Sequence, residues 1–202
     1  LKMGRVGARG AMVSGPPTMA RCRSGCVSSG LPGQMRVLFI DIDGVLHPAA
    51  GAGVWHPQPD QVMADRAINS GYFREQQMGC LAAVLRASGA RLVLTSSWRL
   101  RPESEQAVNS ALESRGLAPI ASSTGAEDVG RVAQIWRWLA DHRNEVAGYA
   151  VVDDSDLSFT AGSGGRGPLR PSPIRAHFVR TPSASGLASS HVQRLVAKLK
   201  QP

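Results

Sequence analysis

Short apolar runs alternate with segments of helical periodicity along most of this chain. Residues 37–40 (VLFI) are wholly apolar and lie between turn-forming residues, which is typical of a parallel strand that is buried on both faces. Further strands are expected at residues 91–94, 119–121, 149–152 and 176–179.

Between and after these strands, several segments place their apolar residues on one helical face. In residues 129–141 this face contains Val132, Ile135, Trp136 and Leu139, so we expect Trp136 in the core and Trp138 partly exposed. The other helices are expected at residues 75–87, 103–114 and 191–199. Alternating strands and helices predict an α/β fold, a Rossmann-like doubly wound parallel sheet of about five strands.

The N-terminal part of the chain differs from the rest in its organisation. Residues 1–34 are rich in Gly, Ser, Pro and Arg and have no periodicity, so we expect a disordered basic leader or a translation start at Met35. Residues 35–202 are expected to form one domain. Within it, residues 161–173 contain four Gly and three Pro and are interpreted as a surface loop.

The composition excludes several classes of protein. The 202 residues are 43% hydrophobic and have a mean hydropathy of −0.12, as expected of a chain that folds around its own core. No apolar run reaches the roughly 18 residues of a membrane span. Three cysteines and the lack of a secretory signal argue against a disulfide framework, so we expect a cytoplasmic protein.

The net charge of +8 is unevenly distributed. Residues 1–35 carry five basic side chains and residues 157–202 carry seven, and neither segment has an acidic residue. Residues 36–156 carry 11 basic and all 15 acidic side chains. Two interpretations of the basic ends remain open, namely solvated termini and attraction to an anionic partner such as nucleic acid.

Carboxylates and hydroxyls follow three of the expected strands. Asp41 and Asp43 follow the first strand, Thr95 and Ser96 follow the second, and the acidic segment 153–156 follows the fourth. Because the carboxyl ends of parallel strands share one edge of a sheet, we expect these side chains to meet there. A calcium loop also begins with Asp-x-Asp, but it requires a glycine at its sixth position, which this segment lacks.

These segments resemble the motifs of the haloacid dehalogenase-like (HAD) superfamily of phosphohydrolases over about residues 36–196. FIDIDGVL is similar to the first motif, LVLTSS to the second and AVVDDSD to the fourth. TSSWR, GRVAQIWRWL and HFVRTPSASGL look similar to the phosphatase-like domains attached to multidomain RNA-repair proteins. The resemblance implies a HAD-like core and a phosphatase, that is, a phosphomonoester hydrolase.

Phosphoryl transfer needs a nucleophile and a proton for the leaving oxygen, and the first motif offers both. Asp41 is the expected nucleophile, which would form an aspartyl-phosphate. Asp43 would protonate the leaving alcohol and then activate the hydrolytic water. Gly44 is expected in the substrate-binding part of the site, where it allows a sharp exit of the chain beside the phosphate.

Converging carboxylates and a phosphate dianion repel one another unless a cation lies between them. Mg²⁺ is the expected cofactor, because it is a hard ion that binds a few carboxylate and phosphate oxygens. The resemblance implies that its ligands are Asp41, the backbone carbonyl of Asp43 and an acid of the fourth motif. Of the two fourth-motif acids, Asp154 is the expected Mg²⁺ ligand, and Asp153 would support it.

The third motif departs from the family pattern, which places a lysine or sometimes an arginine before the fourth strand. This chain has no lysine between its second and fourth expected strands. Arg131 is the expected catalytic substitute, because a guanidinium can clamp phosphoryl oxygens, although an exposed first-turn arginine would look the same in sequence. Arg99 and Ser96 are further substrate-binding candidates, and Thr95 is expected to donate a hydrogen bond to the transferring phosphoryl group.

Access to this site is expected to be open. Superfamily members commonly carry a cap domain after the first motif or between the second and third, but residues 46–75 and 100–130 are too short for one. A capless site suits a bulky phosphorylated substrate, such as an RNA or DNA end. Trp98 either packs in the core, which is the commoner role of a tryptophan, or stacks on a base.

Two functions of other classes remain as alternatives. A phospho-receiver-like module also clusters acids, a threonine and a lysine, but it carries its phosphoacceptor after a middle strand and its lysine after the last. A catalytically silent nucleic-acid-binding domain would use only the basic ends. The second alternative predicts that replacing Asp41 leaves every activity of the protein unchanged.

Overall fold

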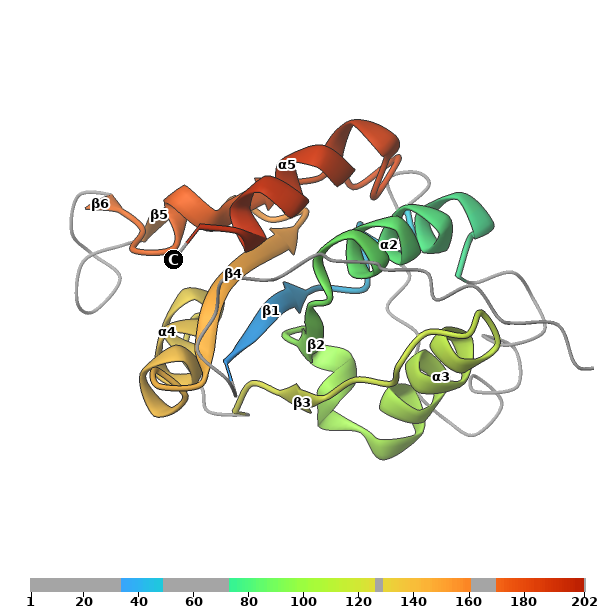
Figure 1. Cartoon of the computed structure of the whole chain (residues 1–202), viewed down its shortest axis with the longest axis horizontal. Coiled ribbons are helices and arrows are strands. Elements are labelled where there is room, and N and C mark those ends of the chain that lie inside the picture. Colours follow the sequence, from blue (N-terminus) through green and yellow to red (C-terminus); the bar gives the residue numbers. More distant parts are fainter. Residues whose placement is uncertain (1–33, 49–72, 126–128, 161–169, 202) are drawn as a thin grey trace, which may run out of the picture.

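The computed structural model describes residues 34–48, 73–125, 129–160 and 170–201, and its centre is a five-stranded sheet (Figure 1). The strand order is β3-β2-β1-β4-β7, and every neighbouring pair is parallel. The predicted Rossmann-like α/β sheet is therefore confirmed. The strands are β1 (Met35–Ile40), β2 (Arg91–Leu94), β3 (Ser122–Ser123), β4 (Val146–Asp153) and β7 (Phe178–Arg180).

Helices cover both faces of this sheet (Figure 1). On one face, α2 (Glu75–Ser88), α3 (Pro102–Glu113) and α5 (Ser189–Leu199) contribute to a single apolar cluster. On the other face, α4 (Arg131–Asp141) packs into a second cluster. Two short 3-10 helices, η1 (Ser97–Leu100) and η2 (Arg175–His177), connect the larger elements.

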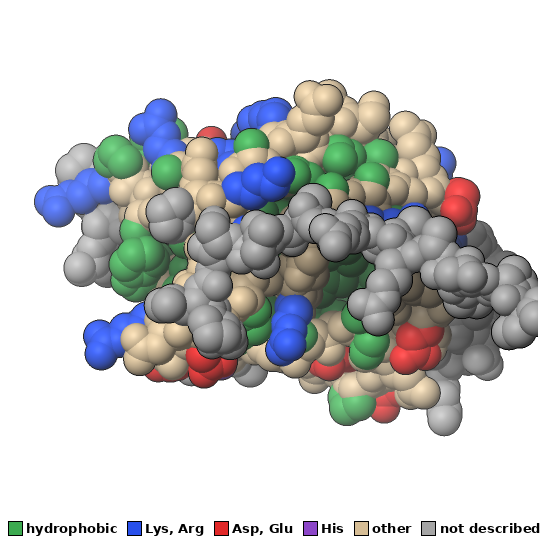
Figure 2. Space-filling model, viewed as in Figure 1, with side chains coloured by type: hydrophobic (Ala, Val, Ile, Leu, Met, Phe, Trp, Pro, Cys, Tyr) green, Lys and Arg blue, Asp and Glu red, His purple; other side chains and the backbone are tan. Residues whose placement is uncertain are grey.

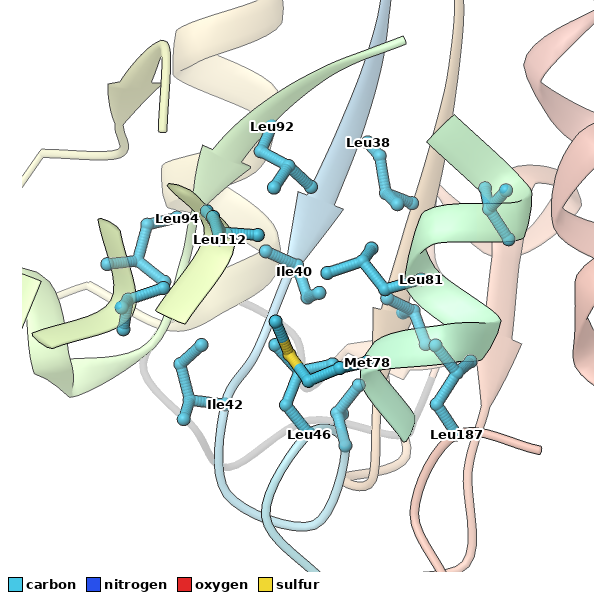
Figure 3. Packing of buried hydrophobic residues seen from close by; sticks show 14 of the residues in the cluster. Leu38, Ile40, Ile42, Leu46, Met78, Leu81, Leu92, Leu94, Leu112 and Leu187 are labelled. Atoms are coloured by element: carbon cyan, nitrogen blue, oxygen red, sulfur yellow. The ribbon is translucent and has the colours of Figure 1, made fainter. Parts of the chain in front are cut away.

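The central strand β1 is apolar throughout because its two sides face different clusters. Leu38 and Ile40 contact the cluster on the α2 side, and Figure 3 shows them beside Leu81 of α2. Val37 and Phe39 contact the cluster on the α4 side. All four side chains are at most 1% exposed, and full burial of each contributes about 2 kcal/mol to folding.

The two edge strands lie a few residues from their predicted positions. The strand expected at 119–121 forms at Ser122–Ser123, although the Ala121 N–H already donates to the carbonyl of Leu92. The strand expected at 176–179 begins only at Phe178, because residues 175–177 form η2. An edge strand pairs on one side only, so the neighbouring strand decides where it begins, and here Val151 of β4 pairs with Phe178.

The prediction for the two tryptophans of α4 was wrong. Trp138 is 7% exposed and its ring lies edge-on to Phe39, whereas Trp136 is 50% exposed. The inward stripe of α4 contains Arg131, Ile135 and Trp138, which follow one another at spacings of four and three residues. The position of Arg131 against the end of the sheet therefore turns Trp136 outward.

A short antiparallel ribbon of β5 (Phe159–Thr160) and β6 (Arg170–Pro171) extends from the sheet. Part of the expected surface loop is thus paired, and both β6 residues are exposed as predicted. Residues 161–169 of that loop, the expected leader up to residue 33 and most of segment 46–75 lie outside the described residues. Among the residues that are described, no helix is long and apolar enough to cross a membrane.

Candidate active site

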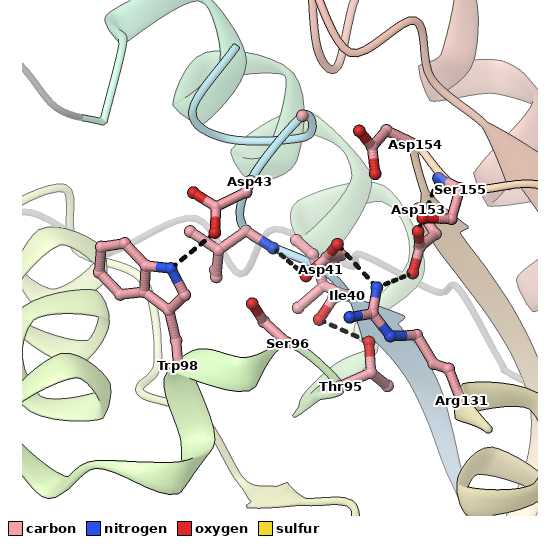
Figure 4. A network of polar contacts seen from close by, with 12 residues as sticks. Ile40, Asp41, Asp43, Thr95, Ser96, Trp98, Arg131, Asp153, Asp154 and Ser155 are labelled. Atoms are coloured by element: carbon pink, nitrogen blue, oxygen red, sulfur yellow. Dashed lines mark hydrogen bonds and ion pairs between the residues drawn. The ribbon is translucent and has the colours of Figure 1, made fainter. Parts of the chain in front are cut away.

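The predicted polar residues gather where the strand order of the sheet reverses. β2 and β4 lie on opposite sides of β1, so the crevice beyond β1 and β4 is the switch point at which α/β sheets bind ligands. Asp41 follows β1 directly, and Asp153 is the last residue of β4 (Figure 4). Thr95 and Ser96 follow β2 at the same edge of the sheet (Figure 4).

Three carboxylates form a compact cluster in this crevice. Asp41, Asp153 and Asp154 each offer an oxygen atom, and these atoms lie within 4.8 Å of one another. Asp41 is 5% exposed and Asp153 is fully buried, so water screens their mutual repulsion only weakly. Such a cluster requires a cationic partner.

Arg131 supplies positive charge to this cluster from the first position of α4. Its Nη1 donates to Asp41 Oδ2 at 2.7 Å and also to Asp153 Oδ2. Burial acts to lower the pKa of Arg131, but the charges of Asp41 and Asp153 and their hydrogen bonds outweigh it and raise the pKa above its ordinary value. The guanidinium therefore stays charged and joins the ends of β1 and β4.

Asp153 keeps a tendency to bind a proton despite this ion pair. Burial raises its pKa, the charge of Asp41 raises it further, and Arg131 lowers it, with a net pKa of about 6. The second oxygen of Asp153 accepts the backbone N–H of Ser155 at 2.8 Å. The positive charge of Arg131 thus compensates only part of the repulsion within the cluster.

The backbone turn after β1 packs closely against Asp154. Gly44 has a φ of +70°, and a Cβ atom at this position would lie 2.2 Å from Asp154 Oδ2. Only glycine combines this backbone conformation with so close an approach. We expected Gly44 beside the substrate phosphate, whereas its close contact is with an acid of the cluster.

The two hydroxyls after β2 differ in what they contact. The Thr95 hydroxyl donates to the carbonyl of Ile40 at 3.0 Å, and this hydrogen bond links the end of β2 to β1. The Ser96 hydroxyl is buried and has no hydrogen-bond partner among the described residues. Figure 4 shows it below the Asp43 and Asp41 side chains, at the same edge of the sheet. Ser96 is therefore better placed than Thr95 to donate a hydrogen bond to a bound phosphoryl group.

Arg99 is directed into the protein. Its guanidinium donates to the backbone carbonyls of Thr95 and Ser96 at 2.8 Å each, and to the Gln134 side chain at 3.0 Å. Further bonds to the carbonyls of residues 124 and 125 occupy its remaining donors. Arg99 thus braces the loop after β2, and this geometry does not support the substrate contact that we expected.

The Asp43 carboxylate lies apart from the three-acid cluster. Its Oδ2 accepts a hydrogen bond of 3.0 Å from the indole Nε1 of Trp98, which is 9% exposed. In Figure 4 the carboxylate is turned toward Trp98 and away from Asp41. The core interpretation of Trp98 agrees with its burial, but its polar contact with Asp43 was not predicted.

Other contacts of the site come from a segment to which the sequence assigned no role. The Ser183 hydroxyl donates to Asp154 Oδ2 at 2.6 Å, and Arg180 Nε donates to the Asp154 carbonyl at 2.9 Å. The Thr181 hydroxyl donates to the Gly44 carbonyl at 2.9 Å. These residues belong to the stretch HFVRTPSASGL, whose resemblance to RNA-repair domains was the available signal.

Comparison with known proteins agrees with this arrangement. A family model described as the HAD domain in Swiss Army Knife RNA repair proteins matches residues 37–192. A search of curated proteins and a search of solved structures found nothing that matches the chain. The matched span contains every strand of the sheet except the first two residues of β1, and all the acids of the cluster. With this coverage, the chain belongs to the family of HAD domains in Swiss Army Knife RNA repair proteins.

Proposed function

We propose that this protein is a Mg²⁺-dependent phosphomonoester phosphatase that acts through an aspartyl-phosphate on Asp41. The family consists of phosphatase-type hydrolases. The aspartyl-phosphate mechanism, the dependence on Mg²⁺ and the substrate are the proposal. The observation that carries the proposal is the pairing of buried Asp41 with Arg131 inside a cluster of three carboxylates. A charged carboxylate in such surroundings is suited to attack a phosphorus atom held beside it.

In the first half-reaction, an oxygen of Asp41 forms a bond to phosphorus while the bond from phosphorus to the alcohol oxygen breaks. Asp43 transfers its carboxyl proton to that departing oxygen, and the alcohol leaves neutral. In the second half-reaction, Asp43 removes a proton from water, the hydroxyl oxygen bonds to phosphorus, and the bond to Asp41 breaks. Phosphate is released and both carboxyl groups return to their starting states.

Charge compensation is the role of Arg131 in this proposal. Its guanidinium contacts Asp41, so it lies beside the atom that gains the phosphoryl group. A guanidinium has several N–H donors, which allows it to keep one contact with a carboxylate and offer another to a phosphoryl oxygen. The family pattern usually uses a lysine for this purpose, and Arg131 is the proposed counterpart.

The donor set of the cluster fits Mg²⁺. Oxygen atoms of Asp41, Asp153 and Asp154 lie within 4.8 Å of one another, and hard carboxylate oxygens are the ligands that this ion prefers. Asp41 and Asp154 would hold the ion together with the backbone carbonyl of Asp43, and Asp153 would support them. A bound Mg²⁺ would neutralise part of the charge on the substrate phosphate.

A terminal phosphate of a nucleic acid is the proposed substrate. The family description names RNA repair proteins, and the described residues between α3 and α4 form only the short strand β3, which leaves little material for a cap there. Exposed Arg170, Arg175 and Arg194 belong to the C-terminal basic segment. Figure 2 shows several basic side chains over α5 and the β5–β6 ribbon, and acidic ones over α3, over α4 and at the start of α2. Such a surface favours a polyanion.

The test is hydrolysis of 4-nitrophenyl phosphate by the wild type and by Asp41→Asn, with MgCl₂ or with EDTA. We expect turnover only by the wild type with Mg²⁺, and loss of at least about 1,000-fold in kcat for the variant. RNA and DNA oligonucleotides with a 5′- or 3′-phosphate are compared next, and we expect a higher kcat/KM for one of them than for free nucleotides.

Each outcome distinguishes between functions. Turnover in EDTA, or an active Asp41→Asn variant, would contradict the mechanism. Binding of oligonucleotides without hydrolysis would favour the catalytically silent nucleic-acid-binding domain. Equal kcat/KM values for free nucleotides and phosphorylated oligonucleotides would contradict the nucleic-acid end as substrate and leave the phosphatase mechanism in place.

A further inference from the structure

The tryptophan two residues after Ser96 makes a specific contact with a carboxylate of the first motif. Trp98 and Asp43 are 55 residues apart in sequence, yet the indole Nε1 donates to Asp43 Oδ2 at 3.0 Å. Trp98 belongs to η1, which begins directly after the two hydroxyl residues of the site. The contact therefore joins the end of β2 to the turn after β1.

The indole ring is held firmly in this position. Trp98 is 9% exposed and Phe73 is 4% exposed, and their rings pack edge to face with centroids 5.8 Å apart. The Arg99 N–H donates to the Ser96 carbonyl and the Arg101 N–H to the Trp98 carbonyl, which fixes the backbone of η1. A ring packed in this way presents its N–H in one direction only.

An indole N–H can donate a hydrogen bond but cannot accept one. The oxygen that faces Trp98, Asp43 Oδ2, must therefore accept, and this hydrogen bond fixes the direction of the carboxyl group. Figure 4 shows the Asp43 carboxylate turned away from Asp41, with the Ser96 hydroxyl below both acids. A phosphoryl group bound at Ser96 would then have the nucleophile and the proton donor on different sides, as an in-line displacement requires.

We propose that Trp98 is a positioning residue for Asp43, whose carboxyl group it holds at the leaving-group side of the site. This inference rests on the proposed phosphatase function. In the reaction, the O–H bond of the Asp43 carboxyl group breaks and the proton bonds to the departing alcohol oxygen as the phosphorus–oxygen bond to that alcohol breaks. Trp98 itself exchanges no proton.

Two substrates that differ in their leaving group distinguish loss of Asp43 positioning from a general loss of stability. An alkyl phosphate, such as the terminal phosphate of an oligonucleotide, needs a proton on its leaving oxygen, whereas 4-nitrophenolate leaves readily as an anion. For Trp98→Phe we expect kcat/KM to fall about 10- to 100-fold with the oligonucleotide and about 2-fold or less with 4-nitrophenyl phosphate. In an Asp43→Asn background, the same substitution should cause no further loss with the oligonucleotide.

Trp138→Phe is the matched control. Trp138 is 7% exposed and its Nε1 donates to Ser122 Oγ at 2.8 Å, so the variant loses a similar buried hydrogen bond away from the carboxylates. We expect equal, small effects on both substrates. If Trp98→Phe fails to fold, benzothienylalanine at position 98 keeps the bicyclic ring and removes only the N–H.

Two results would overturn the proposal. One is an equal loss with both substrates, and the other is a loss that persists in the Asp43→Asn background, because either would assign Trp98 a structural role. These results differ from failure of the proposed function, in which the wild type itself has no activity that depends on Asp41.

Discussion

Arg131 Nη1 lies 2.7 Å from Asp41 Oδ2, although the two residues are 90 positions apart in the sequence. The same nitrogen donates to Asp153, so one guanidinium joins the ends of two neighbouring strands. Both carboxylates are buried, and the ion pair is therefore poorly screened by water. This relationship makes Arg131 important for folding as well as for the proposed chemistry.

Replacing Arg131 should destabilise the metal-free protein. Arg131→Ala leaves two buried carboxylates without their partner, which we expect to cost about 3 kcal/mol of unfolding free energy. Arg131→Lys keeps a positive charge at the position and should restore most of the stability and activity. The measurement is urea unfolding at pH 7 in EDTA. Arg86→Ala, at an exposed position of α2, is the control and should change stability by about 0.5 kcal/mol or less.

The two hydroxyls after β2 should have separable effects. Thr95→Val removes the hydrogen bond to the Ile40 carbonyl, so we expect a loss of about 1 kcal/mol in stability. Ser96→Ala removes no hydrogen bond within the described residues and should leave stability unchanged while lowering kcat/KM about 10-fold. Thermal unfolding and steady-state kinetics of both variants test this. A stability loss for Ser96→Ala with normal kinetics would contradict the assignment.

Replacing Gly44 should weaken metal binding, whereas replacing another glycine of similar backbone conformation should not. In Gly44→Ala the new Cβ would displace the Asp154 carboxylate, and the Mg²⁺ concentration for half-maximal activity should rise about 10-fold or more. Gly89 has a φ of +66°, and a Cβ added there would have nothing within 4 Å. Gly89→Ala should therefore lose only about 1 kcal/mol of stability and keep its Mg²⁺ dependence.

The buried acid of the cluster predicts a pH dependence of stability. Burial and Asp41 raise the pKa of Asp153 from 3.8 to about 6, so the folded protein binds this proton more tightly than the unfolded chain. Between about pH 4 and pH 6 this group makes the metal-free protein less stable as pH rises. Asp153→Asn should remove this pH dependence of the unfolding free energy. The measurement is unfolding of the wild type and the variant in EDTA across this pH range.

Mg²⁺ should oppose this effect, because a metal ion and a proton compete for the same carboxylates. We expect the rise in Tm on adding MgCl₂ to be larger at pH 7 than at pH 5, where Asp153 is mostly protonated. Ca²⁺ at equal concentration is a useful comparison. A Tm that Mg²⁺ leaves unchanged at both pH values would argue against a metal in this cluster.

The elements that the sequence predicted most accurately are those whose pattern is local. The apolar run of β1 and the helical face of α2 were located within two residues at each end, because hydrogen bonding within a helix and burial of a strand impose short-range periodicity. β3 and β7 were displaced because a two- or three-residue edge strand has no periodicity of its own. The exposure of Trp136 and Trp138 was inverted because the ion pairs of Arg131 with Asp41 and Asp153 set the rotation of α4, and these are tertiary contacts.

By itself, the sequence determined the order of the elements and the delivery of Asp41, Asp43, Asp153 and Asp154 to the ends of their strands. This follows because each acid comes next to an apolar strand, and the ends of parallel strands share one edge. Only the tertiary structure decided which groups pair there. Trp98 meets Asp43 across 55 residues and Ser183 meets Asp154 across 29, and such contacts depend on how strands and helices pack in space. No spacing along the chain encodes those distances.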